Sequence, residues 1–251
     1  MAQIAHLKIE GKPLYARIEE DRIYRIDSPF QISGGTLLPA IAEEQIEYLP
    51  PILPNKLFAV GRNYTEHIRE IGGERPSEPL FWLKAPSSIL PHNGFIQIPY
   101  PEHRTDFEIE LAIVIGKTGK NIPLSSVQNY ILGYTCALDI TDRTIQKVEG
   151  QWSRCKSFDT FTPLGPVIET DLDPSKLKIQ LFQNDILKQD GNTEMMIFDC
   201  HQIISHVSQG ITLSAGDVIL TGTPCGIGPI TSGDTLKACI EGIPPLTVHV
   251  K

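Results

Sequence analysis

Residues 105–119, TDFEIELAIVIGKTG, show the clearest alternation of apolar and polar side chains in the sequence. Phe107 and Ile109 alternate with Glu108 and Glu110 before a continuous apolar run begins. Because successive side chains of a strand point to opposite faces, the pattern predicts a single strand with both glutamates on one face. The run LAIVIG predicts that this strand enters a buried sheet, where charges usually have a role. The alternative is a solvated edge strand whose acids face water.

The first fifty residues predict a small, separate β unit. Apolar and polar positions alternate in short runs from residue 5 to 27, with a break at Glu20-Asp21, as in a meander of strands. The stretch YLPPILPNK follows as a linker, since its prolines disfavour both helix and central strand. We therefore expect an N-terminal unit over residues 1–50 and a main domain over residues 51–251.

The main domain is predicted to be mainly β, in the α+β class. Its first stretch, LFAVGRNYTEHIREIGG (57–73), indicates a short strand followed by a helix that ends at the glycine pair. Residues 123–131 and 199–209 are the best further helices, and both are short. The remainder indicates strands punctuated by Gly, Pro and Asp.

Composition and charge exclude several classes of protein. A net charge of −8 and the lack of a basic patch disfavour nucleic acid as a partner. No apolar run approaches the length of a membrane span, and the first residues do not resemble a signal peptide. The 5 cysteines form no CxxC pair, which favours free thiols in a reducing compartment. We expect a cytoplasmic protein with no membrane or nucleic-acid partner.

Three further places carry candidate chemistry. His67 and Glu70 lie three residues apart, so they share a helix face, and a carboxylate bonded to one imidazole nitrogen makes the other nitrogen a better base. An exposed pair of no consequence is the alternative. Asp139 interrupts an apolar strand, and a buried carboxylate needs a partner. Lys156 precedes a proline-broken loop, where it is either a surface lysine or an anion-binding one.

The sequence resembles the fumarylacetoacetate hydrolase family, similar to its acylpyruvate hydrolase and oxaloacetate decarboxylase members, over roughly residues 56–240. Seven stretches in the family's order carry this resemblance, which makes the signal specific although each stretch is weak alone. They are VGRNYTEH (60–67), EPLFWLKAPSSI (78–89), DFEIELAIVIGK (106–117), YTCALDITDR (134–143), QWSRCKSFDTFTPLGP (151–166), QDGNTEMMIF (189–198) and GDVILTGTPCGIG (216–228).

The resemblance implies a catalytic domain with a rolled mixed β-sheet, a homodimer and a divalent metal held by three carboxylates. The implied metal ligands are Glu108, Glu110 and Asp139. The implied catalytic residues are His67 and Glu70, as a dyad on a lid helix, and Lys156 beside the metal. The implied substrate-binding residues are Arg62, Arg143, Gln146 and Thr223.

One segment departs from the family pattern. Members often read S/T-A-R-D/E after the third ligand, whereas Asp142 and Thr144 occupy the places of the alanine and the acid here. Asp142 is therefore a rival for the third ligand position. Asp139 remains the expected ligand, because it aligns directly and ends the apolar strand.

A trio of carboxylates suits Mg²⁺ or Mn²⁺ rather than zinc. A 2-oxo acid could chelate such an ion, and the ion would stabilise an enolate formed when a carbon–carbon bond breaks. We expect acylpyruvate hydrolysis, oxaloacetate decarboxylation or both. The alternatives are an isomerase or tautomerase of oxaloacetate or 2-hydroxyhepta-2,4-dienedioate, and a non-catalytic protein that binds metal and metabolite.

Overall fold

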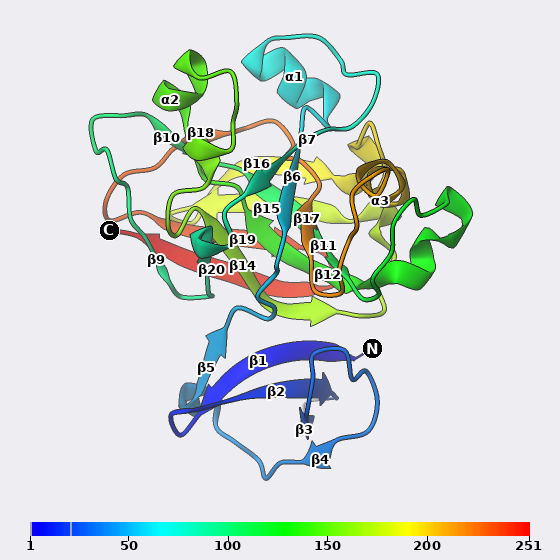
Figure 1. Cartoon of the computed structure of the whole chain (residues 1–251). Helices are drawn as coiled ribbons and strands as arrows, with labels where there is room; N and C mark the ends of the chain where they lie inside the picture. Colours follow the sequence, from blue (N-terminus) through cyan, green and yellow to red (C-terminus); the bar gives the residue numbers. More distant parts are fainter. Residues whose placement is uncertain (1, 21) are drawn as a thin grey trace.

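The computed structural model describes residues 2–20 and 22–251, and it confirms a mainly β fold (Figure 1). The strands are β1 (Gln3–Ile9), β2 (Lys12–Glu19), β3 (Arg22–Ile26), β4 (Thr36–Leu37), β5 (Ile46–Leu49), β6 (Leu57–Gly61), β7 (Leu80–Lys84), β8 (Ile89–Leu90), β9 (Phe95–Ile96), β10 (Thr105–Phe107), β11 (Ile109–Ile115), β12 (Ile131–Leu138), β13 (Thr141–Asp142), β14 (Thr162–Glu169), β15 (Lys178–Gln183), β16 (Ile186–Asn192), β17 (Val218–Leu220), β18 (Gly228–Pro229), β19 (Thr235–Ile240) and β20 (Ile243–Val250). The helices are α1 (Thr65–Ile71), α2 (Arg143–Val148) and α3 (Cys200–Val207), with 3₁₀ turns η1 (Glu43–Gln45), η2 (Pro86–Ser88), η3 (Leu124–Tyr130), η4 (Arg154–Lys156), η5 (Pro174–Lys176) and η6 (Thr193–Met195).

The largest sheet has the strand order β4-β3-β2-β1-β14-β12-β11-β17-β6-β7. It is mixed, because β17 and β6 run parallel while most other neighbours are antiparallel. A second sheet, β16-β15-β19-β20-β9, packs against it, and a small sheet, β13-β10-β18, lies beside the candidate site. The prediction of a mixed, β-rich main domain is confirmed.

Strand β11 lies at the centre of the large sheet and is buried along its whole length. Ile109 and Leu111 face the core shared with the second sheet, whereas Ala112 and Val114 pack into a separate cluster on the opposite face. Burial on both faces explains why the sequence is continuously apolar here. Glu110 has the same parity as Ala112, so it projects from the face opposite the larger core.

The prediction of one strand over residues 105–119 is wrong at Glu108, where the strand breaks. β10, before the break, pairs with β13 and β18 in the small sheet, whereas β11 pairs with β12 and β17 in the large one. The carboxylate of Glu108 is bound by cations from distant segments, which sequence alternation does not reveal. The helix expected over residues 123–131 forms a 3₁₀ turn, η3, and the one expected over 199–209 is the shorter helix α3.

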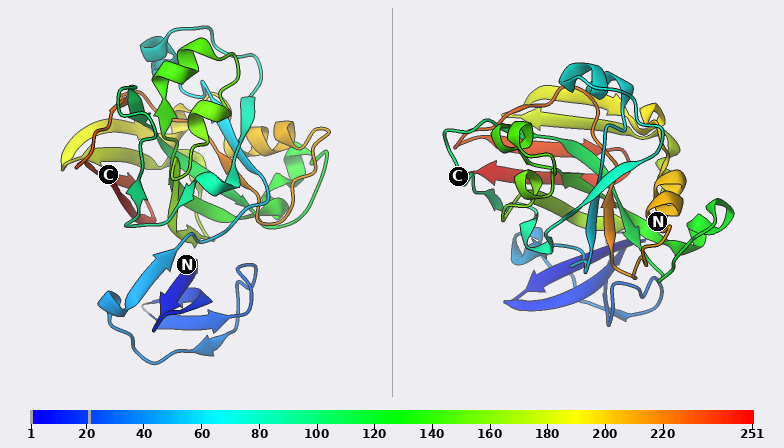
Figure 2. Two further views of the ribbon diagram at one scale, coloured as in Figure 1. Left: turned by 60° about the vertical axis from the view of Figure 1, so that its left-hand side comes forward. Right: turned by 45° about the horizontal axis from the view of Figure 1, so that its top comes forward.

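The N-terminal strands form the expected meander and lie below the rest of the molecule in both pictures (Figure 1, Figure 2). Of the predicted break at Glu20-Asp21, Asp21 lies outside the described residues. β1 pairs antiparallel with β14, and Val167 of β14 packs with Leu7 of β1. The division into residues 1–50 and 51–251 stays a prediction, since the large sheet runs through both parts.

Helices α1 and α2 lie at the end of the molecule opposite the N-terminal strands (Figure 1). Both are short, and across the described ranges no helix has the length and apolar character needed to cross a membrane.

Candidate functional site

Three neighbouring strands of the large sheet, β12, β11 and β17, bring the predicted acids to one place. Ile109 of β11 pairs with Leu138 of β12, so Asp139 comes next to Glu108. β17 is the neighbour of β11 on its other side, and the TGTP loop that follows β17 reaches Glu110 through a hydrogen bond of 2.6 Å from the Gly222 N–H.

The acid cluster consists of Glu108, Glu110 and Asp139, all buried. Each offers one carboxylate oxygen within 4.8 Å of the others, and within the described residues this is the one group of acids, histidines or cysteines with such spacing. The rival Asp142 lies outside it. One of its oxygens caps α2 by accepting from the Ile145 N–H at 2.9 Å, and the other contacts His103 Nδ1 at 2.7 Å.

Lys156 links two members of the acid cluster. Its Nζ donates to Glu108 Oε2 at 2.8 Å, to Asp139 Oδ2 at 2.7 Å and to the Thr141 hydroxyl at 2.7 Å. The side chain is buried, so the alternative of a surface lysine is excluded. Arg143, at the start of α2, donates to Glu108 and, at 2.9 Å, to Asp106.

Lys84 is a component of the site that the sequence analysis missed. It lies on β7, is buried, and donates to Asp139 and to the main-chain oxygen of Phe161. The motif FWLK resembles an edge strand ending in a surface lysine. The feature of the sequence that indicated such a partner was Asp139, since a carboxylate inside an apolar strand requires a buried cation or donor.

The cations act unequally on the three acids. Burial alone would raise the pKa of Glu108, but the charges of Lys156 and Arg143 hold it well below the ordinary value. Burial, together with the charges of Asp139 and Glu108, raises the pKa of Glu110 well above the ordinary value. Among the residues described, Glu110 forms no ion pair, whereas Glu108 and Asp139 each form two. The cluster is thus short of positive charge at Glu110.

His67 and Glu70 form a contact on helix α1, with Nδ1 and Oε2 separated by 3.2 Å. His67 is buried, contrary to the alternative of an exposed pair, and its ring lines the same pocket as Glu108 and Glu110. The second oxygen of Glu70 accepts from the Gly226 N–H at 3.0 Å, which ties α1 to the loop after β17.

The remaining predicted residues also line this pocket. Gln146 accepts from Arg143 at 2.8 Å, and the Thr223 hydroxyl accepts from Gln189 at 2.8 Å. Arg62 lies on the pocket wall beside an apolar surface that sequence reasoning missed, formed by Trp82 and Trp152 with ring centres 5.2 Å apart. The full lining is Val60, Gly61, Arg62, His67, Ile71, Trp82, Glu108, Glu110, Arg143, Gln146, Trp152, Lys156 and Thr223.

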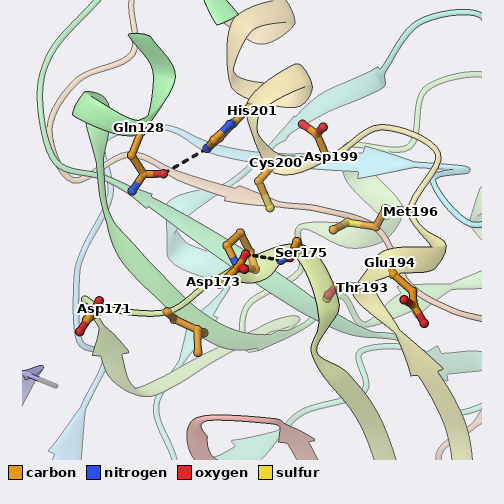
Figure 3. A pocket seen from close by; sticks show the side chains of 12 residues that line it. Gln128, Asp171, Asp173, Ser175, Thr193, Glu194, Met196, Asp199, Cys200 and His201 are labelled. Carbon is orange, nitrogen blue, oxygen red and sulfur yellow. Dashed lines mark hydrogen bonds between the residues drawn. The ribbon is translucent and has the colours of Figure 1, made fainter. Parts of the chain in front are cut away.

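A wider pocket beside α3 contains none of these residues (Figure 3). Two of its acids have local structural roles: Asp173 accepts from the Ser175 N–H at 3.0 Å, and Asp199 caps α3 through the Gln202 N–H at 2.8 Å. His201 contacts Gln128 at 3.1 Å in the same pocket.

Known proteins resemble this chain in both sequence and structure. Residues 56–251 match the family described as fumarylacetoacetate (FAA) hydrolase C-terminal. The mitochondrial oxaloacetate decarboxylase of Dictyostelium discoideum is 43% identical over 195 residues, 75% of this chain and 89% of that protein. The mitochondrial oxaloacetate tautomerase of Arabidopsis thaliana is 41% identical over 202 residues, 78% of this chain and 91% of the relative. A crystal structure of a 2-hydroxyhepta-2,4-diene-1,7-dioate isomerase from Mycobacterium marinum superposes with a TM-score of 0.89 at 36% identity and covers 100% of this chain and 98% of its own.

Proposed function

Since this chain belongs to the fumarylacetoacetate hydrolase family, we propose that it is a divalent-metal-dependent enzyme that cleaves a carbon–carbon bond in a small 2-oxo acid. The observation that carries the proposal is the buried cluster of Glu108, Glu110 and Asp139, because Glu108 and Glu110 also line one pocket together with Lys156 and His67. Perturbed titratable groups that converge in a pocket are typical of an active site.

The residues present fit Mg²⁺ or Mn²⁺. Glu108, Glu110 and Asp139 would hold the ion, and their hard oxygen donors are those such ions prefer. Glu110 has the raised pKa of a carboxylate that lacks a cation, and a divalent ion there would balance its charge. When bound, the ion would supply Lewis-acid polarisation of the 2-oxo group.

Lys156 and Arg143 supply fixed positive charge beside the substrate position. Burial would lower the pKa of Lys156, but Asp139 and Glu108 raise it above the ordinary value, so the ammonium group stays charged. A preorganised cation in a pocket closed to water stabilises an oxyanion more strongly than it would in solution. We assign this role to Lys156, and a substrate-binding role to Arg143 together with Gln146 and Thr223.

His67 is assigned as the base. Glu70 is an acceptor for the Nδ1–H of His67, so the dyad favours the tautomer whose Nε2 lone pair is free. That nitrogen could take a proton from water during acylpyruvate hydrolysis. Decarboxylation of oxaloacetate needs no such water, because the bond breaks with loss of CO₂.

Tautomerisation is the second candidate reaction, since the Arabidopsis relative is named an oxaloacetate tautomerase and the M. marinum structure an isomerase. The same dyad could move a proton between carbon and solvent. We further propose that the protein is a homodimer, for which the measured mass in solution is the test.

The decisive experiment compares oxaloacetate, acetylpyruvate and fumarylpyruvate with the purified protein in Mg²⁺, in Mn²⁺ and in excess chelator. CO₂ release, pyruvate release and loss of enol absorbance separate decarboxylation, hydrolysis and tautomerisation. We expect turnover of at least one substrate that chelator abolishes. Full activity in chelator would contradict the metal-dependent proposal, and tautomerisation without bond cleavage would favour the second candidate.

A further inference from the structure

The peptide unit between Thr221 and Gly222 is held from both sides by buried side chains. Its N–H, at Gly222, donates to Glu110 Oε2 at 2.6 Å. Its C=O, at Thr221, accepts from the side-chain amide of Asn63 at 2.7 Å. Because both groups belong to one planar unit, the bond from Asn63 fixes the direction in which the N–H points at Glu110. Asn63 is thus linked to a member of the acid cluster through the main chain.

The side chain of Asn63 is itself held firmly. It is completely buried, and its Oδ1 accepts from the Phe198 N–H at 2.8 Å. Its Nδ2 donates to the main-chain oxygens of Phe198, at 3.0 Å, and of Thr221. These partners also determine which end of the amide is oxygen, since an N–H requires an acceptor and carbonyl oxygens require donors. The amide therefore provides a rigid anchor for the loop after β17.

The main chain of this loop is shaped to bring the peptide unit to Glu110. Gly222 has a φ of 96°, in the region that favours glycine, and an added Cβ would lie 2.8 Å from the Cβ of Asn63. The N–H and the hydroxyl of Thr221 both donate to the main-chain oxygen of Leu111, at 3.0 and 2.9 Å. Since Leu111 follows Glu110 directly, the loop and the carboxylate are positioned together.

Glu110 depends on this peptide unit more than the other two members of the acid cluster do. Glu108 and Asp139 are each oriented by two ion pairs. Within residues 2–20 and 22–251, the Gly222 N–H is the one hydrogen-bond donor to the Glu110 carboxylate. A carboxylate with one oxygen held by an oriented donor presents the other oxygen in a fixed direction.

We propose that Asn63 is a positioning residue for the expected metal ligand Glu110. This inference rests on the proposed function, and it assigns a role to a residue that lies outside the lining of the candidate pocket. By holding the Thr221–Gly222 peptide, Asn63 keeps Oε2 of Glu110 engaged and leaves the other oxygen for the ion. Partners that orient a metal ligand in this way typically contribute about 10- to 100-fold to metal affinity.

Metal binding by two matched variants tests the proposal without an activity assay. In Mn²⁺ calorimetry, Asn63→Ala should bind the ion about 10- to 100-fold more weakly than the wild type. The control is Ser208→Ala, at the end of α3, which removes another buried side chain that accepts a main-chain N–H, from Ile122 at 2.9 Å. This control should lower stability but leave Mn²⁺ affinity within about twofold, because effects at independent sites do not couple.

Hydrogen exchange in the metal-free protein separates positioning from general stability. Relative to the Ile113 amide in the buried strand β11, the Gly222 amide should exchange about 3- to 10-fold faster in Asn63→Ala, the scale of one neutral hydrogen bond. A purely structural role would accelerate both amides equally, because global unfolding exposes both, and that result would overturn the inference.

The wild type supplies a further measurement that needs no folded variant. Its Gly222 amide should stay protected from exchange when Mg²⁺ is added, and loss of protection on metal binding would overturn the inference. Mn²⁺ affinity within about threefold of the wild type in Asn63→Ala, or an equal loss in Ser208→Ala, would overturn the inference alone. If the wild type binds neither Mg²⁺ nor Mn²⁺, the metal-dependent proposal fails and the inference fails with it.

Discussion

Lys84 and Asp139 form an ion pair in which both side chains are completely buried. The lysine comes from β7, 55 residues before the aspartate, so the contact joins the edge of the large sheet to its centre. Burial lowers the pKa of Lys84, and the charge of Asp139 opposes that effect. Because solvent reaches neither side chain, water cannot take the place of a partner that is removed.

Replacing Lys84 with Met should therefore destabilise the metal-free protein by about 3–5 kcal/mol, because it leaves a buried carboxylate with one cation fewer. Urea unfolding in chelator measures this change. Lys84→Met combined with Asp139→Asn should cost less than the sum of the two single changes. Lys8→Met, which breaks the exposed pair with Glu47, is the control and should cost at most about 1 kcal/mol. An equally small effect at Lys84 would show that the pair contributes little.

The two candidate aspartates should behave differently. Asp139→Asn should weaken Mg²⁺ or Mn²⁺ binding at least about tenfold, because it removes a charged ligand. Asp142→Asn should leave metal affinity within about twofold, since its side chain caps α2 and asparagine is also a good cap. Calorimetry of metal binding distinguishes the two variants. A larger loss of metal affinity in Asp142→Asn than in Asp139→Asn would assign the site to Asp142.

Glu110→Ala should abolish activity while the protein stays folded.

The metal-free protein should lose stability as the pH rises above about 4.5, the ordinary value for glutamate. The raised pKa of Glu110 means that the folded protein keeps a proton that the unfolded chain has released. Because the folded state then binds more protons, its free energy of unfolding decreases with pH over that interval. Urea unfolding in chelator from about pH 5 to about pH 8 should show a shallower decrease for Glu110→Gln than for the wild type. Equal slopes would mean that Glu110 ionises normally in the folded protein.

His67→Ala should separate the candidate reactions. Loss of a general base should lower acylpyruvate hydrolysis by about 10²- to 10⁴-fold, whereas oxaloacetate decarboxylation should fall much less. Glu66→Gln, on the exposed side of the same helix, is the matched control and should change neither rate. Equal losses in both reactions would indicate that the dyad only positions substrate. No loss in either would make α1 a scaffold and favour the tautomerase.

The local pattern of the sequence predicted the strands that carry the candidate site better than it predicted the side-chain contacts within the site. The alternation around Glu110 was sufficient to place it on a strand of a buried sheet, and the apolar run before Asp139 was sufficient to place that residue at the end of the neighbouring strand. The break at Glu108 could not be predicted, because it accompanies ion pairs to residues 35 and 48 positions later in the chain. Trp152 was missed for a similar reason, since its contact with Trp82 depends on how a loop folds against the distant strand β7.

The pairing of β1 with β14 makes the first fifty residues a cover for a sheet edge. Without them, the main-chain N–H and C=O groups of β14 that now bond to β1 would face solvent. The side chains of Val167 and Ile168 on the same strand would lose their apolar neighbours. Exposed edges of this kind recruit strands from other molecules. A fragment that begins at residue 51 should therefore aggregate even though every candidate catalytic residue is present. Light scattering of the fragment and the whole chain at equal concentration would show the difference.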